Sequence, residues 1–272
     1  MKPCAFDYVR VESVEEATAL LCEHGDDARI LAGGQSLMPL LNMRLASPAL
    51  VVDISRVPAL DYARPERDAL CVGAACTQAK VEWRSDLARE VPLLALAFPH
   101  ISHFQVRSRG TVCGSIAHAD PSAELPLALT ALGGEVVLRS ARGTRTVAAG
   151  DFFQGMLSTA RTAHELVEEV RFPLHRSGLG YGFAELAQRH GDFAIVACAA
   201  VAGADEIRFA VGGAGDRPRL ARWPRLASAD LDAALNDFAW EIDARSDPHA
   251  PAKYRRHLVR HLGRRAVEAA CA

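Results

Sequence analysis

The amino-acid sequence predicts an α+β protein built from three successive units. The first, residues 1–55, places a helical pattern between two short buried runs. The second, residues 56–175, mixes strand and helix patterns and contains a hairpin signal at 141–143. The third, residues 176–272, begins with strand-like runs and ends in helices. We expect a two-lobed domain at 1–175, a small β-α-β unit plus a mixed sheet with helices, followed by a smaller α/β C-terminal domain.

The elements of the first unit follow from local signals. Residues 13–16 form a capping box that opens a helix with an apolar stripe, and Gly25 ends it. Strands are expected at 29–32 and 50–53, with a glycine turn and a short helix to about Arg44 between them. These elements predict a β-α-β-type unit with a glycine loop at its centre.

The second and third units give a coarser prediction. Strands are expected at 70–73, 135–139, 144–147 and 166–172, and a helix at 93–97. Pro, Ser and Gly gather between 173 and 180, which favours a domain boundary there. Further strands are expected at 182–187, 195–202 and 207–211, and helices follow, notably at 252–270.

Composition excludes several classes of protein. Half of the 272 residues are hydrophobic and 24% are charged, as in ordinary globular proteins. The formal net charge of −2 gives no basic field for nucleic acid or a membrane surface. No run approaches the ~18 apolar residues of a membrane span, and the first residues do not resemble a signal peptide. We therefore expect a cytoplasmic protein.

The seven cysteines predict neither disulfides nor a metal centre. Their number is odd and their spacing irregular. Cys71 and Cys76 have the spacing that opens a plant-type iron–sulfur pattern, but the next ligand position is Ala79. Any iron–sulfur cluster that works with this chain must therefore belong to another chain.

Three further patterns are interpreted as structural. The glycines at 212–215 follow a strand and indicate a turn. The pairs His100/His103 and His257/His261 lack a third ligand, so no metal site is expected. Residues 253–265 hold six Lys or Arg and no acid, which favours a solvated helix face or a subunit contact.

The first candidate binding loop is Ala32-Gly33-Gly34-Gln35-Ser36, directly after an expected strand. Paired glycines let backbone N–H groups approach a phosphate closely. The spacing matches neither the Rossmann pattern nor the P-loop. Taken alone, the pattern is a weak signal, because most such Gly-Gly turns are only tight turns.

The second candidate loop spans residues 109–115 and leads into 118–126. Thr111 and Ser115 supply hydroxyls, Gly114 permits close approach, and Glu124 can accept hydrogen bonds from sugar hydroxyls. A strand–turn–helix connection with a Pro-started helix is the alternative interpretation.

Taken together, the two loops resemble the FAD-binding domain shared by the xanthine dehydrogenase and carbon monoxide dehydrogenase families. The first loop resembles the family's first pyrophosphate loop, and residues 105–111, running into Ser115 and Asp120-Pro121, resemble its second. Residues 189–194 and Tyr254-Arg255-Arg256 also match. The matches run in order from Phe6 to about Arg265, nearly the whole chain.

The resemblance implies a cofactor site for FAD and no catalytic acid or base in this chain. Residues 31–37 would wrap the pyrophosphate, and residues 111–115 would hold its second face. Glu124 would bind ribityl or ribose hydroxyls. Ile101 would contact an apolar part of the flavin, and Phe193 would lie near the flavin ring. The implied FAD-binding residues are Leu31, Ala32, Gly33, Gly34, Gln35, Ser36, Leu37, Ile101, Thr111, Val112, Cys113, Gly114, Ser115, Asp120, Glu124 and Phe193.

Two positions depart from the family pattern. Cys113 replaces a glycine usually found in the second loop, and Glu185 stands near a position where lysine is common. If φ at position 113 is negative, the cysteine is tolerated and its thiol lies beside the cofactor. The glutamate leaves the electrostatics around the flavin open.

The resemblance implies an electron-transfer subunit of a molybdenum-containing hydroxylase. A large molybdenum-cofactor subunit would hydroxylate the substrate, a small [2Fe-2S] subunit would carry electrons to FAD, and FAD would pass them to an external acceptor. The assembly implied is a dimer of heterotrimers. A self-sufficient flavin oxidase or reductase and a non-enzymatic FAD-binding protein are the alternatives. The substrate cannot be read from this chain.

Overall fold

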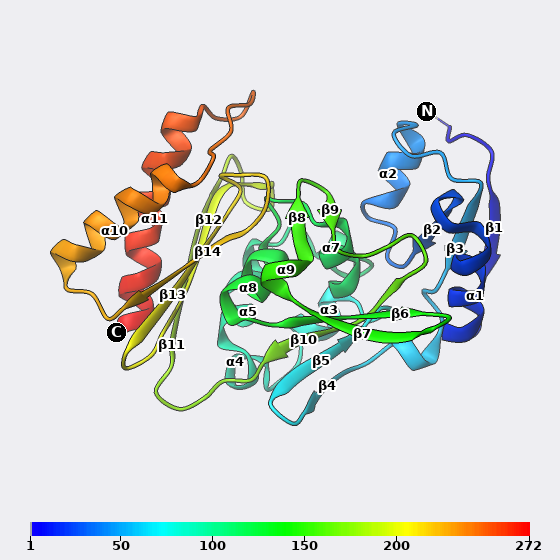
Figure 1. The fold of residues 1–272 in the computed structure, drawn as a ribbon, viewed down its shortest axis with the longest axis horizontal. Helices are drawn as coiled ribbons and strands as arrows, with labels where there is room; N and C mark the ends of the chain where they lie inside the picture. The colour runs from blue at the N-terminus through cyan, green and yellow to red at the C-terminus, as the bar shows by residue number, and fades with distance from the viewer. Residues whose placement is uncertain (1) are drawn as a thin grey trace.

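The structure, a computed structural model, describes residues 2–272 and has the predicted α+β class. Figure 1 shows three units in a row, with the N-terminal unit at one end and the C-terminal sheet and helices at the other. Among residues 2–272, no helix combines the length and the apolar character that crossing a membrane requires.

The N-terminal unit is a three-stranded parallel sheet in the order β1-β3-β2. Its elements are β1 (Asp7–Arg10), α1 (Val14–His24), η1 (Gly25–Asp27), β2 (Ala28–Leu31), α2 (Leu37–Asn42) and β3 (Leu50–Asp53). The capping box is present: the Glu16 backbone N–H donates to Ser13 Oγ at 3.1 Å, and Gly25 ends α1 with φ of 50°. Strand β1 was not predicted, because its side chains are mostly exposed and give no buried apolar run.

The central unit is a five-stranded sheet in the order β4-β5-β10-β6-β7, accompanied by short helices. Its elements are η2 (Pro58–Leu60), β4 (Ala63–Glu66), β5 (Ala69–Gly73), α3 (Gln78–Glu82), α4 (Leu87–Glu90), α5 (Pro92–Ala97), η3 (Phe98–His100), α6 (Phe104–Arg107), α7 (Val112–His118), α8 (Glu124–Leu132), β6 (Glu135–Ser140), β7 (Gly143–Ala148), α9 (Ala149–Phe152), β8 (Phe153–Gly155), β9 (Ser158–Thr159) and β10 (Leu166–Pro173). The small pair β8–β9 forms a separate ribbon.

All pairings of the central sheet are antiparallel, where a mixed sheet was expected. The reason lies in the connections. Two-residue turns join β4 to β5 and β6 to β7, and such short turns can only reverse the chain direction. The last strand, β10, then inserts between β5 and β6 and completes the sheet.

Helix α8 is the central packing element of the molecule. All nine of its residues are buried, because it contacts α5 and α7 on one side and strands β12 (Ala194–Ala202) and β13 (Glu206–Gly212) on the other. Helix α8 therefore joins the central unit to the C-terminal sheet through apolar side chains.

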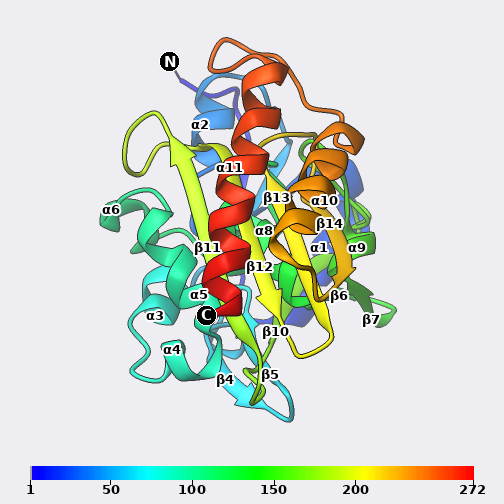
Figure 2. The same ribbon diagram turned by 90° about the vertical axis from the view of Figure 1, so that its left-hand side faces the viewer.

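The C-terminal unit is a four-stranded antiparallel sheet in the order β11-β12-β13-β14, followed by two helices. Its remaining elements are β11 (Gly180–Ala187), β14 (Arg219–Pro224), α10 (Ser228–Glu241) and α11 (Ala252–Cys271). Figure 2 shows α11 lying across the outer face of this sheet. The strands are consecutive and precede the helices, in the order that the sequence predicted. The polar edge strand β14 was not predicted.

Close helix–sheet contact explains the small residues of β11 and β12. Strand β12 is buried along all nine residues, with α11 on one side and α8 on the other. A Cβ atom at Gly182 would come within 2.8 Å of the Ala266 carbonyl carbon. Glycine at this position lets the backbone of α11 rest on the strand.

Arg255, in the Tyr254-Arg255-Arg256 run of α11, has a structural role. This side chain is 1% exposed and donates hydrogen bonds to the carbonyl oxygens of Ile195 at 2.6 Å and Gly213 at 2.8 Å. Its other terminal nitrogen donates to Asp247 Oδ2 at 2.6 Å. One buried guanidinium thus ties α11 to the start of β12 and to the turn after β13, where Gly213 has φ of 79°.

The other basic side chains of α11 mostly face α10 rather than solvent alone. Arg256 lies 4.5 Å from the ring centroid of Trp240, and Arg260 donates to Asn236 Oδ1 at 2.9 Å. Arg264 forms an ion pair with Asp232. The basic run therefore serves contact between the two last helices.

Candidate cofactor site

A cavity of about 590 Å³ lies where the N-terminal unit meets the central unit. Both sequence-predicted loops line it, and residues 191–193 of the β11–β12 connection also contribute. Its size falls within the ~300–1,000 Å³ typical of small-molecule and cofactor sites. The cavity is therefore assembled from all three units of the fold.

The two loops touch through their backbones. A Cβ atom at Gly33 would collide with the Arg109 carbonyl oxygen and would lie 2.7 Å from Gly110 Cα. No side chain can be accommodated there without separating the loops. Glycine at position 33 is thus required by the contact between the loops themselves.

The first loop presents its backbone to the cavity. Gly34 has φ of 74°, a conformation that only glycine adopts without strain. The backbone N–H groups of residues 34–36 donate to no atom within the described chain, residues 2–272. Adjacent N–H groups that are left free in such a turn suit an anionic group such as a pyrophosphate.

The second loop is held rigidly by its own hydrogen bonds. Thr111 caps α7, because its Oγ1 accepts from the Gly114 backbone N–H at 3.0 Å. The Gln78 backbone N–H donates to the Gly110 carbonyl oxygen at 2.8 Å, and Thr77 forms an isolated β-bridge with Thr111. These contacts fix the loop against α3.

Cys113 lies within α7 and has no positive φ, so replacing the family's glycine causes no backbone strain. The residue is buried at the edge of the cavity, and its Sγ donates to the Val72 carbonyl oxygen at 3.3 Å. Burial raises the pKa of the Cys113 thiol well above its usual range. The thiol is therefore protonated at neutral pH.

Glu124 begins α8 and lines the cavity with its side chain buried. Burial raises the pKa of the Glu124 carboxyl to about 7, and the nearby Asp120 contributes in the same direction. Asp120 itself caps a turn, since its Oδ1 accepts from the Ser122 backbone N–H at 2.8 Å. The cavity wall therefore contains an acid whose charge changes near neutral pH.

The third wall comes from Ile101 and from the loop that carries Phe193. Ile101 is buried, whereas the Phe193 side chain is 67% exposed. Gly191, with φ of 84°, packs so closely on His103 that a Cβ atom would lie 2.7 Å from its Cε1. This close approach holds the Phe193 loop against the segment after η3.

All but two of the sixteen predicted site residues line this one cavity. Leu31 and Val112 do not: Leu31 belongs to β2, and Val112 is fully buried in the core. The roles of the individual residues remain predictions.

Several residues that line the cavity were missed. Gln78 is the most informative, because its Oε1 is buried without a hydrogen-bond partner in the described chain. Arg29, Arg161, His118 and Leu157 also contribute. Burial lowers the pKa values of Arg161 and His118. Gln78 lies at the site because the β-bridge between Thr77 and Thr111 brings it there, and no local sequence pattern predicts that bridge.

The lining fits the chemistry of FAD. The free N–H groups of the glycine loop suit the pyrophosphate. The Glu124 carboxyl and the unpartnered Gln78 oxygen can accept hydrogen bonds from sugar hydroxyl or ring N–H groups. Apolar side chains such as Ile54 and Val106 suit an aromatic ring. When bound, FAD supplies redox chemistry, and this chain positions it.

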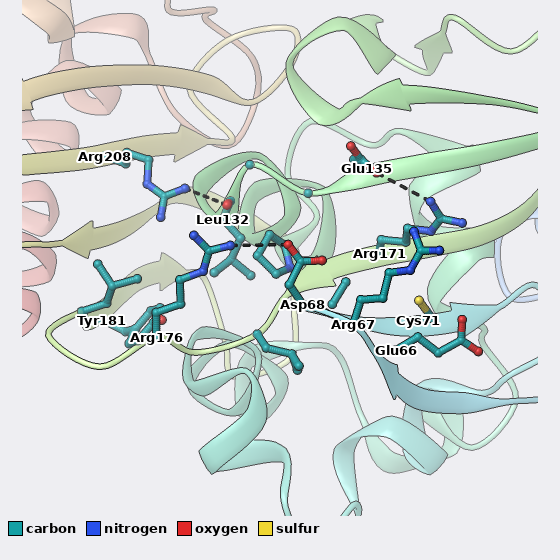
Figure 3. Close-up of a pocket in the computed structure, with 16 residues that line it drawn as sticks. Glu66, Arg67, Asp68, Cys71, Leu132, Glu135, Arg171, Arg176, Tyr181 and Arg208 are labelled. Carbon is teal, nitrogen blue, oxygen red and sulfur yellow. Dashed lines mark hydrogen bonds and ion pairs between the residues drawn. The ribbon is translucent and has the colours of Figure 1, made fainter.

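A second cleft, of about 620 Å³, lies elsewhere and is polar (Figure 3). Three of its four arginines are already engaged: Arg208 Nη1 donates to the Leu132 carbonyl oxygen at 2.7 Å, Arg176 forms an ion pair with Asp68 at 3.4 Å, and Arg171 donates to Glu169 Oε1 at 2.6 Å. None of the predicted site residues lines this cleft. The candidate cofactor site is therefore the cavity between the two loops.

Comparison with known sequences agrees with this assignment. Residues 4–175 match the FAD binding domain in molybdopterin dehydrogenase, and residues 181–270 match the CO dehydrogenase flavoprotein C-terminal domain. The chain is 39% identical over 280 residues to caffeine dehydrogenase subunit beta of Pseudomonas sp. (strain CBB1), covering 98% of this chain and 95% of that protein. It is 38% identical over 279 residues to the nicotine 6-hydroxylase medium subunit of Paenarthrobacter nicotinovorans, covering 98% of each.

Solved structures give the same result. A chain of carbon monoxide dehydrogenase from Hydrogenophaga pseudoflava matches with a TM-score of 0.94 and 32% identity, covering 100% of this chain and 99% of that one. A chain of quinoline 2-oxidoreductase from Pseudomonas putida 86 matches with a TM-score of 0.92 and 33% identity over the same shares. FAD is thus the cofactor of this chain, which belongs to the family of FAD-binding medium subunits of molybdenum hydroxylases and is the flavoprotein component of an oxidoreductase.

Proposed function

We propose that this chain is an electron-transfer subunit whose FAD receives electrons from the iron–sulfur clusters of a partner and passes them to an external acceptor. The observation that carries the proposal is a preformed cavity in which a backbone anion cradle and a flavin-sized apolar region meet beside an exposed aromatic side chain, Phe193. An exposed wall of this kind leaves one side of a bound flavin accessible to an acceptor.

We further propose that the partners are a large molybdenum-cofactor subunit and a small [2Fe-2S] subunit, in a dimer of heterotrimers. Names of relatives such as "medium subunit" and "medium chain" describe proteins that work with other chains. Trp83 and Phe104 support a docking surface: their rings stack at 5.4 Å, and both side chains are substantially exposed. Oxidation of the organic substrate would then take place on the large subunit.

The finer assignments belong to the same proposal. The fourteen predicted residues that line the cavity act in binding FAD, with the pyrophosphate on the first loop and the flavin ring toward Ile101 and Phe193. The FAD-binding domain spans residues 1–175, with subdomains at about 1–55 and 56–175, and the C-terminal flavoprotein domain spans 176–272. The location is cytoplasmic, which cell fractionation of the native host tests.

The function is tested with protein purified from its own host. Native mass spectrometry is expected to show this chain with two other kinds of subunit, and the isolated chain should carry one non-covalent FAD. Photochemical reduction should bleach that flavin, while no aldehyde, heterocycle or carbon monoxide is oxidised by the chain alone. Robust turnover by the isolated chain would instead favour the self-sufficient flavin oxidase.

A further inference from the structure

A further cleft, of about 510 Å³, adjoins the candidate cofactor site and has no role assigned so far. Five residues line both spaces: Asp120, Leu157, Gly191, Asp192 and Phe193. Most of the other residues that line this adjoining cleft belong to the C-terminal unit. Its size suits a small molecule. A molecule bound in the adjoining cleft would therefore lie next to a cofactor bound in the cavity.

Large apolar side chains are exposed at the adjoining cleft. Met156 is 51% exposed, Leu157 is 52% exposed and Phe193 is 67% exposed, and all three line the cleft. The first two form the turn between β8 and β9, and the third lies on the connection between β11 and β12. Two segments that are separate in the sequence thus leave apolar side chains uncovered at one place. Such surface marks a binding site for a ligand or a partner.

The turn between β8 and β9 is fixed in an unfavourable conformation. Leu157 has φ of 54°, in the left-handed region that residues with a side chain rarely adopt. Its backbone N–H donates to the Ala119 carbonyl oxygen at 3.2 Å, and Arg217 Nη1 donates to the Phe153 carbonyl oxygen at 3.2 Å. Glycine or polar residues are usual in such a turn, and strain of this kind gathers at functional sites.

The charged groups of the adjoining cleft compensate one another. Three arginines and three aspartates line it. Arg189 forms an ion pair with Asp192 at 3.0 Å, and Arg255 forms one with Asp247 at 2.6 Å. Arg245 lies 3.4 Å from the same Asp247. Within residues 2–272, each arginine of the cleft therefore has an acidic partner, so an uncharged ligand suits the cleft better than one that carries phosphate groups.

We propose that the adjoining cleft binds a neutral quinone, which is the external acceptor of this chain. The proposal rests on the proposed function, in which electrons leave through FAD. A quinone is uncharged and has a flat apolar ring, and its carbonyl oxygens can accept hydrogen bonds from Gln188 and His249, which line the cleft. The quinone takes up two electrons and two protons from reduced FAD and leaves as the hydroquinone, so no further reactant is needed.

The first test measures the binding of duroquinone to the oxidised, FAD-loaded chain by isothermal titration calorimetry. All ring positions of this neutral quinone are substituted, so it does not add to exposed thiols. The variant is Met156→Asp, because Met156 lines the adjoining cleft but not the cofactor cavity. A carboxylate beside the ring should raise the dissociation constant of duroquinone roughly tenfold or more, while the FAD content stays at the wild-type value.

Met43→Asp is the matched control for this variant. Met43 is 49% exposed, much like Met156, and it lines neither the adjoining cleft nor the cofactor cavity. The dissociation constant of duroquinone should therefore be the same in Met43→Asp as in wild type. Equal constants in the two variants, or no binding to wild type, overturn the proposal.

The second test follows reoxidation of the photochemically reduced, FAD-loaded chain by stopped-flow absorbance. The rate should saturate as the duroquinone concentration rises, and the half-saturating concentration should be higher in Met156→Asp than in wild type. Saturable reoxidation by NAD⁺ but not by duroquinone overturns the neutral acceptor. Because light drives the reduction, failure of electron transfer from a partner subunit would leave this result unchanged.

The calorimetric titration is repeated with the complete complex purified from its own host. Duroquinone should bind to the complex with the dissociation constant found for the isolated chain. Loss of binding in the complex would mean that a partner subunit covers the exposed side chains at Met156, Leu157 and Phe193, and it would overturn the proposal.

Discussion

The two loops that wall the cavity are built in different ways. The first loop, residues 32–36, exposes backbone N–H groups and relies on the absence of side chains at Gly33 and Gly34. The second loop, residues 109–115, is held by a side-chain cap and by hydrogen bonds to α3, and it accommodates Cys113 within a regular helix. Tolerance to substitution should therefore differ sharply between two loops that serve one cofactor.

Gly33→Val tests the stricter loop and should have the largest effect. Valine would push against the backbone of residues 109–110, so both loops must separate. We expect FAD affinity to fall by roughly 100-fold or more, equivalent to about 3 kcal/mol. The ratio of flavin to protein absorbance measures it. Gly150→Ala, where a Cβ atom meets nothing within 4 Å, is the control and should keep full FAD.

Glu124→Gln tests whether the Glu124 carboxyl, just after the second loop, makes the stability of the chain depend on pH. The unfolded carboxyl has a pKa of 4.5 and the folded one a pKa of about 7, so the unfolded chain releases its proton first as pH rises. Stability of the flavin-free chain should fall by about 3 kcal/mol between pH 4.5 and pH 7. Urea unfolding should show this loss in wild type and in the control Glu23→Gln. A loss of the same size in Glu124→Gln would contradict the assignment.

Gly34→Val should have a smaller effect than Gly33→Val. The φ of 74° is strained for any other residue, by about 1–2 kcal/mol, and Leu31 and Met38 crowd the new side chain. The variant should fold but lose most of its flavin, with affinity reduced roughly tenfold. Equilibrium dialysis against FAD measures the change. Full FAD occupancy in a folded variant would show that this loop does not form the cradle.

Cys113→Gly should have the smallest effect. The thiol lies in a regular helix and contacts the Val72 carbonyl oxygen, so its loss should leave FAD affinity within a few-fold of wild type. Alkylation sharpens the comparison: the buried Cys113 should react slowly with a maleimide in the flavin-free protein and more slowly still when FAD is bound. Equal alkylation rates in the two forms would mean that the second loop does not cover the cofactor.

The contrast also explains what the sequence could predict. Glycines and caps act locally, so the glycine turn after β2, helix α1 and the hairpin β6–β7 were predicted correctly. Gln78 was missed because its position depends on a bridge between Thr77 and Thr111, residues far apart in the sequence. The antiparallel order of the central sheet depends on pairing between distant strands, which local periodicity does not encode.

The place of β10 in the central sheet has a consequence for synthesis of the chain. Residues 166–173 fill the position between β5 and β6, so a nascent chain that ends before them presents two sheet edges that lack their shared neighbour. Phe193, on the third wall of the cavity, emerges later still. The ribosome must therefore release β11 and the loop after it before all the walls of the pocket exist, so loading of the cofactor comes late in synthesis of the polypeptide.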